Sequence, residues 1–257
     1  MIMFWLKITE QAKHLVNLNN VLKDYLDEKV LKYDDFASAL ANHLGQELKN
    51  QTNGIELNNW FKKILENHPE ILQAAENDIN RLVLVNPACP SHLTAFLSFR
   101  GILAFQAYRI ANAVWNQNDI QSAVLLQNWI ATKWNIDIHP AAKIGSGLFI
   151  DHGIGIVIGE TAVVEDEVSI WHGVTLGSTL SEAGDRHPKI RKGALICAGA
   201  TVLGNIDIGE NSIVAANAVV LKPVEAGVVV AGAPAKVVGQ APSSLATFTT
   251  KIGSENE

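Results

Sequence analysis

The sequence predicts an α-helical N-terminal domain followed by a left-handed parallel β-helix. From Ile138 to about Val224 an aliphatic residue returns every sixth position, a spacing that neither an α-helix nor a half-buried strand produces alone. Hexapeptide repeats are typical of a parallel β-helix, in which each repeat forms one side of a three-sided coil. Sixteen of the 19 glycines follow residue 136. Composition therefore changes where the repeat begins.

The first 134 residues carry apolar side chains at helical spacing. A helix that starts after the caps Asp34 and Asp35 is expected, and another should end near His68-Pro69, because the residue before a proline avoids the helical region. The expected helical stretches are 21–30, 36–44, 60–65, 71–85, 93–116 and 120–134. Such a block is more often a packing and assembly module than a catalytic one, so we expect residues 1–135 to form a helical assembly domain.

The hexapeptide pattern predicts the β-helix residue by residue. The aliphatic positions are Ile138, Ile144, Ile150, Ile156, Ala162, Val168 and Val174, then, after a polar interruption at Leu180–Lys189, Ile190, Ile196, Val202, Ile208, Val214 and Val220. Small residues four places later suit the crowded corners: Ala142, Ser178, Ala194, Ala200, Ser212 and Ala218. We expect the β-helix domain at 136–240, with helices over its first edge and the turn at 227–234 over its last. A flexible tail is expected at 241–257.

Composition narrows the functional class. A net charge of −6 and a pI near 5.8 give no electrostatic case for a nucleic-acid or acidic-membrane partner. Two cysteines, Cys89 and Cys197, cannot form a disulfide scaffold. Lys7 interrupts the apolar start of the chain, so no secretory signal is expected, and no apolar run has the length of a membrane span. The expected compartment is the reducing cytoplasm.

Histidines mark the candidate chemistry. Four of the eight fall in the repeat half: His139, His152, His172 and His187. A lone histidine is more often a surface or hydrogen-bonded residue than a catalytic one, but His152 lies between Asp151 and Gly153. Asp137, fifteen residues earlier, would lie on a neighbouring coil or subunit. A carboxylate there could hold the imidazole tautomer whose free nitrogen accepts a proton.

The polar interruption carries the second candidate. A solenoid has no packing reason for a loop that contains Asp185, Arg186 and His187. An arginine in such a loop can bind a carboxylate through two parallel hydrogen bonds. A zinc site needs three converging ligands. Here His152, His172 and His187 are separated by twenty and fifteen residues, which argues against a metal.

The ordered motifs resemble the bacterial serine O-acetyltransferases over roughly residues 20–240. The runs that carry the resemblance are 137–147, 151–161 and 184–191, supported by 105–110, 126–128 and 231–236. That family builds trimers through the β-helix and usually pairs them into hexamers through the helical block. The resemblance therefore implies a homotrimer or a dimer of trimers.

The resemblance also implies an activity: acetyl transfer from acetyl-CoA to the hydroxyl of L-serine, giving O-acetyl-L-serine for cysteine biosynthesis. By similarity His152 is the general base and Asp137 orients it. The substrate-binding residues implied are Asp151 and Asn86 for the ammonium, with Arg186 and His187 for the carboxylate. The residues implied along the acetyl-CoA groove, between adjacent β-helices, are Thr179, Ala198, Ala216, Gly232 and Lys236.

Three departures leave the acceptor open. Asn86 stands where the family usually has aspartate, which should weaken ammonium binding by about 1–3 kcal/mol. Ser178 and Leu180 replace glycines, and Ile154 replaces a threonine. The alternatives are an acyltransferase for another small hydroxylated or amino acceptor, and a catalytically silent scaffold, which would gain nothing from the His152–Asp137 pair.

The C-terminus bears on partners. Many family members end in an isoleucine that inserts into O-acetylserine sulfhydrylase, whereas this sequence ends at Glu257. The resemblance therefore gives no support for that complex here. Feedback inhibition by cysteine, which is common in the family, depends on the same amino-acid pocket. Because Asn86 changes that pocket, the resemblance does not decide whether this protein is inhibited by cysteine.

Overall fold

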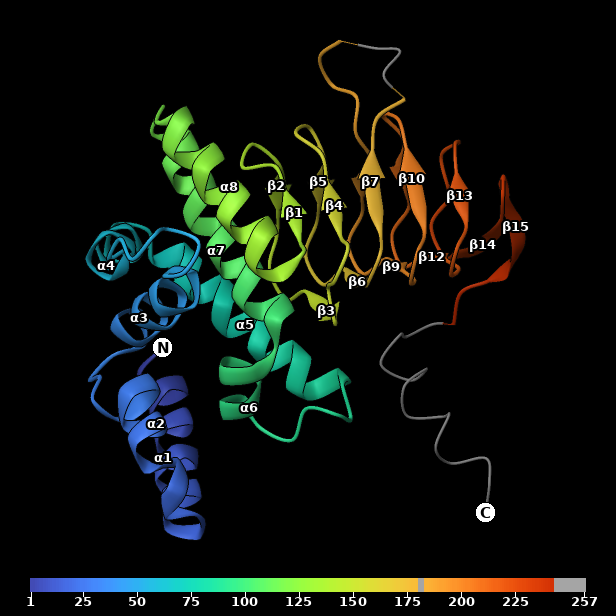
Figure 1. Cartoon of the computed structure of the whole chain (residues 1–257). Helices are drawn as coiled ribbons and strands as arrows, with labels where there is room; N and C mark the ends of the chain where they lie inside the picture. Colours follow the sequence, from blue (N-terminus) through green and yellow to red (C-terminus); the bar gives the residue numbers. More distant parts are fainter. Residues whose placement is uncertain (180–182, 243–257) are drawn as a thin grey trace, which may run out of the picture.

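The computed structural model describes residues 1–179 and 183–242, and Figure 1 shows a helical block at one end of a stack of β-coils. The helices are α1 Ile2–Leu18, η1 Asn20–Leu22, α2 Lys23–Leu26, η2 Asp27–Leu31, α3 Phe36–Leu48, α4 Asn58–Asn67, α5 Pro69–Val85, α6 His92–Ser98, α7 Arg100–Asn116 and α8 Ile120–Trp134. One hydrophobic core runs from Phe4 in the first helix to Val230 near the last coil. The predicted fold class, a helical domain followed by a parallel β-helix of hexapeptide repeats, is confirmed.

Two helical predictions were wrong in detail. The apolar stretch 93–116 is two helices, because Phe99 adopts an extended conformation (φ −91°, ψ 102°) between α6 and α7. The stretch 21–30 is a succession of 3₁₀, α and π turns rather than one helix. The cap of α3 is Asp35, whose carboxylate accepts a hydrogen bond from the Ser38 N–H.

Among the described residues the strands form three sheets around the β-helix. Sheet A contains β1 Asp137–Ile138, β4 Val157–Ile158, β7 Thr175–Gly177, β10 Thr201–Leu203 and β13 Val219–Val220. Sheet B contains β2 Lys143–Ile144, β5 Val163–Val164, β8 Lys189–Ile190 and β11 Asp207–Ile208. Sheet C contains β3 Phe149–Asp151, β6 Ser169–Trp171, β9 Leu195–Ile196, β12 Ile213–Val214, β14 Val228–Gly232 and β15 Ala235–Gln240. We call the turns from sheet C to sheet A the CA corner, and those from sheet A to sheet B the AB corner.

The register corrects the predicted repeat frame. Asp137 pairs with Val157, twenty residues on, whereas Val157 pairs with Thr175, eighteen residues on. The two extra residues lie between β3 and β4, where His152 is. The buried strand positions after this turn are therefore Ile158, Val164, Ile170 and Leu176, and the predicted Ile156, Ala162, Val168 and Val174 are buried between strands. Ser178, predicted at a corner, follows β7 at the start of a long connection.

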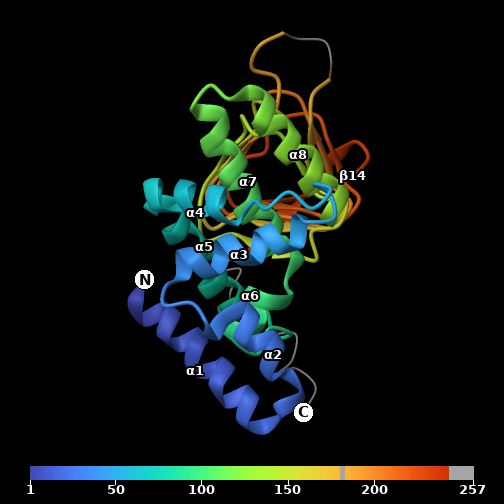
Figure 2. The same cartoon turned by 60° about the vertical axis from the view of Figure 1, so that its left-hand side comes forward.

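Side chains of α5 and α7 satisfy the backbone of the first coil. Tyr108 donates from its hydroxyl to the Ala142 carbonyl, and Asn112 donates to the Pro140 carbonyl. A buried ion pair joins Arg109 to Asp78 at 2.9 Å, and Asp78 also accepts a hydrogen bond from the Leu148 N–H. Figure 2 shows α7 and α8 in front of the coils, with α1 and α2 farther out. The helical block thus covers the edge that would otherwise be open to pairing.

At the other end, β14 and β15 form an antiparallel hairpin that follows the last coil. The hairpin includes the turn at 227–234 that was expected to cover this edge. The predicted flexible tail falls largely on residues 243–257, which lie outside the described residues, as does the C-terminal Glu257 on which the sulfhydrylase argument depends.

Candidate active site

His152 occupies the turn between β3 and β4 on the CA corner. Its backbone has a positive φ of 56°, uncommon for a residue with a side chain, and its imidazole is 70% exposed. Its Nε2 lies 3.8 Å from Oδ1 of Asp151, the last residue of β3. His172 occupies the equivalent turn one coil on, with its ring edge-to-face at 5.8 Å between centroids. Two exposed imidazoles therefore adjoin on this corner.

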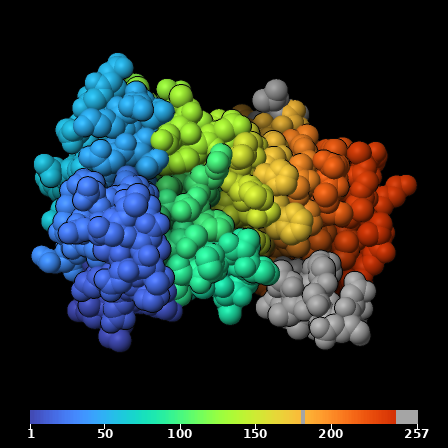
Figure 3. Space-filling model, turned by 60° about the horizontal axis from the view of Figure 1, so that its bottom comes forward, coloured from blue at the N-terminus to red at the C-terminus, as the bar shows by residue number. Residues whose placement is uncertain are grey.

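A cavity of about 300 Å³ beside His152 is lined by both the β-helix and the helical block. Asp151 and Asn86 both line it, so the structure brings together the two residues assigned to the substrate ammonium. The Asn86 side chain accepts a hydrogen bond from the Ala88 N–H at 2.9 Å, which holds the turn after α5. In Figure 3 the green part of the helical block lies against the yellow coils.

Arg100 also lines this cavity, and sequence reasoning missed it. It is the first residue of α7, a position that becomes apparent only once the helix break at Phe99 is known. The sequence signal that could have drawn attention to it is its charge, since Arg100 and Arg109 are the only cationic residues of the apolar stretch 93–116.

Asp137, the predicted orienting carboxylate, begins β1 and is anchored from the helical block. Its Oδ1 accepts a hydrogen bond from Gln127 of α8 at 2.7 Å. The turn that carries His152 is bonded to the same region, because the Gly155 N–H donates to the Asn135 carbonyl at 2.6 Å. The helix α8 therefore fixes the strand that carries Asp137 relative to the turn that carries His152.

Arg186 and His187 lie on the AB corner, at the end of the long connection between β7 and β8. The Arg186 guanidinium pairs with Glu160 at 2.6 Å and thereby lowers the pKa of that carboxyl. The His187 residue is only 6% exposed, and burial, followed by the positive charge of Arg186, lowers its pKa below the ordinary 6.5. His187 is therefore a neutral imidazole at neutral pH.

Four of the five predicted acetyl-CoA residues divide between the same two corners. Ala198, Ala216 and Gly232 continue the row of His152 and His172, since each follows a register-paired strand residue of sheet C by two positions. Thr179 follows β7, near Gly204 on the AB side. Lys236 lies in β15 of the terminal hairpin and lines a separate cavity there.

Within one chain, therefore, the predicted site residues do not all lie close together. His152, Asp151 and Asn86 lie at the CA corner, whereas Arg186 and His187 bond to the Glu160-Thr161 turn at the opposite end of sheet A. The substrate set and the cofactor set are split in the same way. This common division is what an interface between two β-helices would require.

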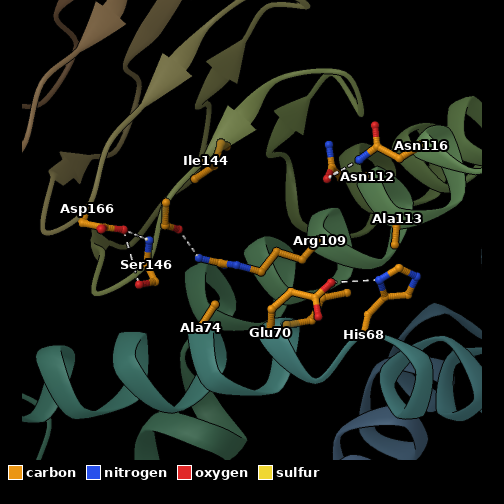
Figure 4. Close-up of a pocket in the computed structure, with 12 residues that line it drawn as sticks. His68, Glu70, Ala74, Arg109, Asn112, Ala113, Asn116, Ile144, Ser146 and Asp166 are labelled. Carbon is orange, nitrogen blue, oxygen red and sulfur yellow. Dashed lines mark hydrogen bonds and ion pairs between the residues drawn. The ribbon is translucent and has the colours of Figure 1, made fainter.

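The cleft in Figure 4 contains none of the predicted site residues. It has a volume of about 370 Å³ and lies between α5, α7 and the first two coils. Its polar groups are paired with one another: His68 with Glu70, Ser146 with Asp166, and Arg109 with the Gly145 carbonyl. These pairs make it part of the junction between the helical block and the β-helix.

Two further findings concern the residues the structure describes. They include no cluster of three or more histidine, cysteine or acidic side chains placed to hold a metal ion. None of their helices combines the length and the apolar character needed to cross a membrane.

Comparison with known proteins identifies the family. Residues 4–107 match the model "Serine acetyltransferase, N-terminal", and residues 187–222 match "Bacterial transferase hexapeptide (six repeats)". A putative serine acetyltransferase of Schizosaccharomyces pombe is 48% identical over 95% of this chain and 92% of its own length. The chain belongs to the serine acetyltransferase family. The serine acetyltransferase of Haemophilus influenzae is 41% identical over the same shares of the two chains.

Solved structures of the family agree with the fold. A serine acetyltransferase in complex with cysteine superposes with a TM-score of 0.92 at 40% identity, covering 97% of this chain and 98% of that one. The Brucella abortus enzyme in complex with coenzyme A gives 0.90 at 39% identity, covering 94% and 97%. The family resemblance seen in the sequence motifs is confirmed.

Proposed function

We propose that this protein transfers the acetyl group of acetyl-CoA to the hydroxyl of L-serine, giving O-acetyl-L-serine and CoA. The observation that carries the proposal is the row on the CA corner: an exposed histidine at its head, beside a cavity with a carboxylate, followed by the small residues Ala198, Ala216 and Gly232. Small side chains leave room along the corner for an extended cofactor arm. Relatives with 40–48% identity carry the same activity in their names.

His152 acts as the general base in this proposal. As the serine oxygen attacks the thioester carbonyl carbon, the imidazole takes the hydroxyl proton, so that no free alkoxide forms. The tetrahedral intermediate collapses, the carbon–sulfur bond breaks, and the proton passes from the imidazolium to the departing sulfur. Such assistance contributes about 10²–10⁴-fold to the rate. Asp137, held by Gln127, would fix the tautomer and stabilise the imidazolium.

Substrate recognition is assigned to the two corners. Asp151 and Asn86 would receive the ammonium at the CA corner, with Asn86 contributing an amide in place of a charge. Arg186 and His187 would receive the carboxylate from the AB corner of a neighbouring chain, and Thr179 and Lys236 would complete the cofactor groove. A neutral His187 donates one hydrogen bond, while Arg186 supplies the charge.

We further propose a trimer with sites shared between subunits. The His152 turn immediately precedes β4 and the Thr161 turn immediately follows it, so both corners lie at the same height along the β-helix. A threefold axis parallel to the β-helix preserves height and can set one chain's CA corner against the next chain's AB corner. Residues 1–135 would pair two trimers, for which the exposed apolar Ile2 and Met3 on α1, 80% and 79% exposed, offer a surface.

The acceptor is tested by thiol release from acetyl-CoA with L-serine, D-serine, L-threonine, L-homoserine and a serine analogue lacking the amino group. Preference for L-serine supports the proposal, and preference for another acceptor would make Asn86, Ile154 and Ser178 the specificity determinants. His152→Ala should lose nearly all turnover while keeping its assembly. His14→Ala, which removes an exposed histidine of α1, is the matched control.

The shared site is tested by complementation. His152→Ala and Arg186→Ala are each expected to be inactive, and co-expression in equal amounts forms mixed trimers. If one chain supplies His152 and its neighbour supplies Arg186, about a quarter of the sites regain both residues. Recovered activity near that fraction supports a site between subunits. No recovery would show that both residues act within one chain.

A further inference from the structure

Thr161 bonds to both residues assigned to the substrate carboxylate. Its hydroxyl oxygen accepts hydrogen bonds from the backbone N–H of Arg186 at 2.9 Å and of His187 at 3.1 Å. Its carbonyl accepts one from the Lys189 ammonium at 2.7 Å, and the same ammonium donates to the His187 carbonyl at 2.9 Å. One residue of the AB corner therefore fixes the backbone at the end of the long connection.

Thr161 also determines the tautomer of His187. Its backbone N–H lies 3.2 Å from His187 Nδ1, and its hydroxyl lies 2.8 Å from the same nitrogen. A backbone amide can only donate, so Nδ1 accepts and the proton of the neutral ring is on Nε2. The imidazole lies over Gly159, where an added Cβ would approach Nε2 to 2.0 Å. The ring is thus oriented as an Nε2–H donor.

The Arg186 guanidinium is held by Glu160, the residue that precedes Thr161. Glu160 accepts one hydrogen bond from it at 2.6 Å, and the Gly184 carbonyl accepts another at 3.1 Å. These two contacts fix the plane of the guanidinium, while the Arg186 side chain stays 30% exposed. Gly159, Glu160 and Thr161 together hold both side chains before any substrate arrives, which lowers the conformational cost of binding.

We propose that Thr161 is the positioning residue of the carboxylate site, acting through Arg186 and His187 without touching the substrate. The proposal rests on the proposed function, because it takes the amino-acid carboxylate as the ligand of that pair. Thr161 orients the Nε2–H of His187 and fixes the backbone from which the Arg186 fork extends. Its loss should weaken the recognition of the carboxylate and spare the recognition of acetyl-CoA.

The test compares two acceptors that differ only in the carboxylate, L-serine and L-serinamide. For Thr161→Val we expect the ratio of kcat/KM for L-serine to that for L-serinamide to fall about tenfold or more, with little change in KM for acetyl-CoA. Gly159→Ala, which displaces the His187 ring and keeps the hydroxyl, should lower the same ratio. Thr161→Ser should restore it, and Thr9→Val, which removes a hydroxyl bonded within α1, should leave it at the wild-type value.

The outcomes separate this inference from the function on which it rests. If the wild-type protein does not acetylate L-serine, the proposed function fails and the inference fails with it. If it does, but uses L-serinamide equally well, or if the variants lose activity toward both acceptors in equal proportion, the positioning role is overturned alone. Should Thr161→Val fail to fold, judged by circular dichroism and sedimentation, Gly159→Ala decides the question.

Discussion

His43 makes the stability of the helical block sensitive to acid. This residue of α3 is 1% exposed, packs against Phe96 at 5.2 Å between ring centroids, and has no hydrogen-bond partner of normal geometry for either ring nitrogen among the described residues. Burial, and then the positive charge of Lys29, lower its pKa from 6.5 to about 3. Glu47, which pairs with Lys29 and with Lys133, opposes this shift in part.

The magnitude follows from proton linkage. Between pH 6.5 and pH 3 the unfolded chain binds a proton at His43 that the folded chain does not, so stability is lost as the pH falls through 6.5. From pH 7.5 to pH 4.5 this one group should remove about 2–3 kcal/mol from the free energy of unfolding. A His43→Leu variant cannot titrate, and at pH 7.5 it should be as stable as the wild type or more so, since it removes unpaired polar atoms.

The assay is urea unfolding of both proteins at pH 7.5 and pH 4.5, at equal protein concentration because assembly contributes to stability. All other titrating groups are common to the two proteins, so the difference in their pH dependence reports His43. The wild type should lose about 2–3 kcal/mol more than the variant over this range. Equal losses would refute the assignment of a buried neutral imidazole.

Three further changes test the site and the domain junction. Asp137→Asn should lower kcat about 10²-fold or more with little change in KM for acetyl-CoA, in steady-state kinetics; an unchanged kcat would count against an orienting carboxylate. Asn86→Asp keeps an acceptor for the Ala88 N–H and adds a negative charge. It should therefore lower KM for L-serine by an amount equivalent to about 1–3 kcal/mol of binding free energy; an unchanged or higher KM contradicts this. Arg109→Met should cost about 3–5 kcal/mol in urea unfolding, because it leaves the buried charge of Asp78 without its cation. Adding Asp78→Asn, which removes the charge and keeps an acceptor for the Leu148 N–H, should recover most of this loss; if nothing is recovered, the ion pair is not its cause.

The β-helix could be predicted because its period is unusual, yet the predicted frame was wrong from Ile156 to Val174 and right again from Ile190 to Val220. Ile156 lies just before β4 and Ile158 ends that strand, and both are aliphatic and buried. A shift of two residues therefore leaves the hydrophobic pattern intact. The twenty-residue offset between the paired strands of the first two coils, as between Asp137 and Val157, reveals it. The missed break at Phe99 has a similar cause, because the apolar pattern continues across it.

The candidate site was predictable as a list of residues and not as an arrangement. Motif spacing identified His152, Arg186 and His187, since each departs from what a solenoid needs for packing. Which corner each one occupies depends on where the chain leaves sheet A, and that requires the register. The role of Thr161 was likewise invisible, because a threonine in a hexapeptide turn has an ordinary structural use.

The long connection between β7 and β8 interrupts the chain without interrupting any sheet. Thr175 pairs with Val157 on one side and Thr201 on the other, and Val163 pairs with Lys189 directly across the insertion, while Figure 1 shows the described parts of the connection projecting from the stack. Loop length and sequence are thereby decoupled from the folding of the coils. Exchange of this segment, in evolution or by grafting, would therefore leave the strand pairing of the scaffold in place.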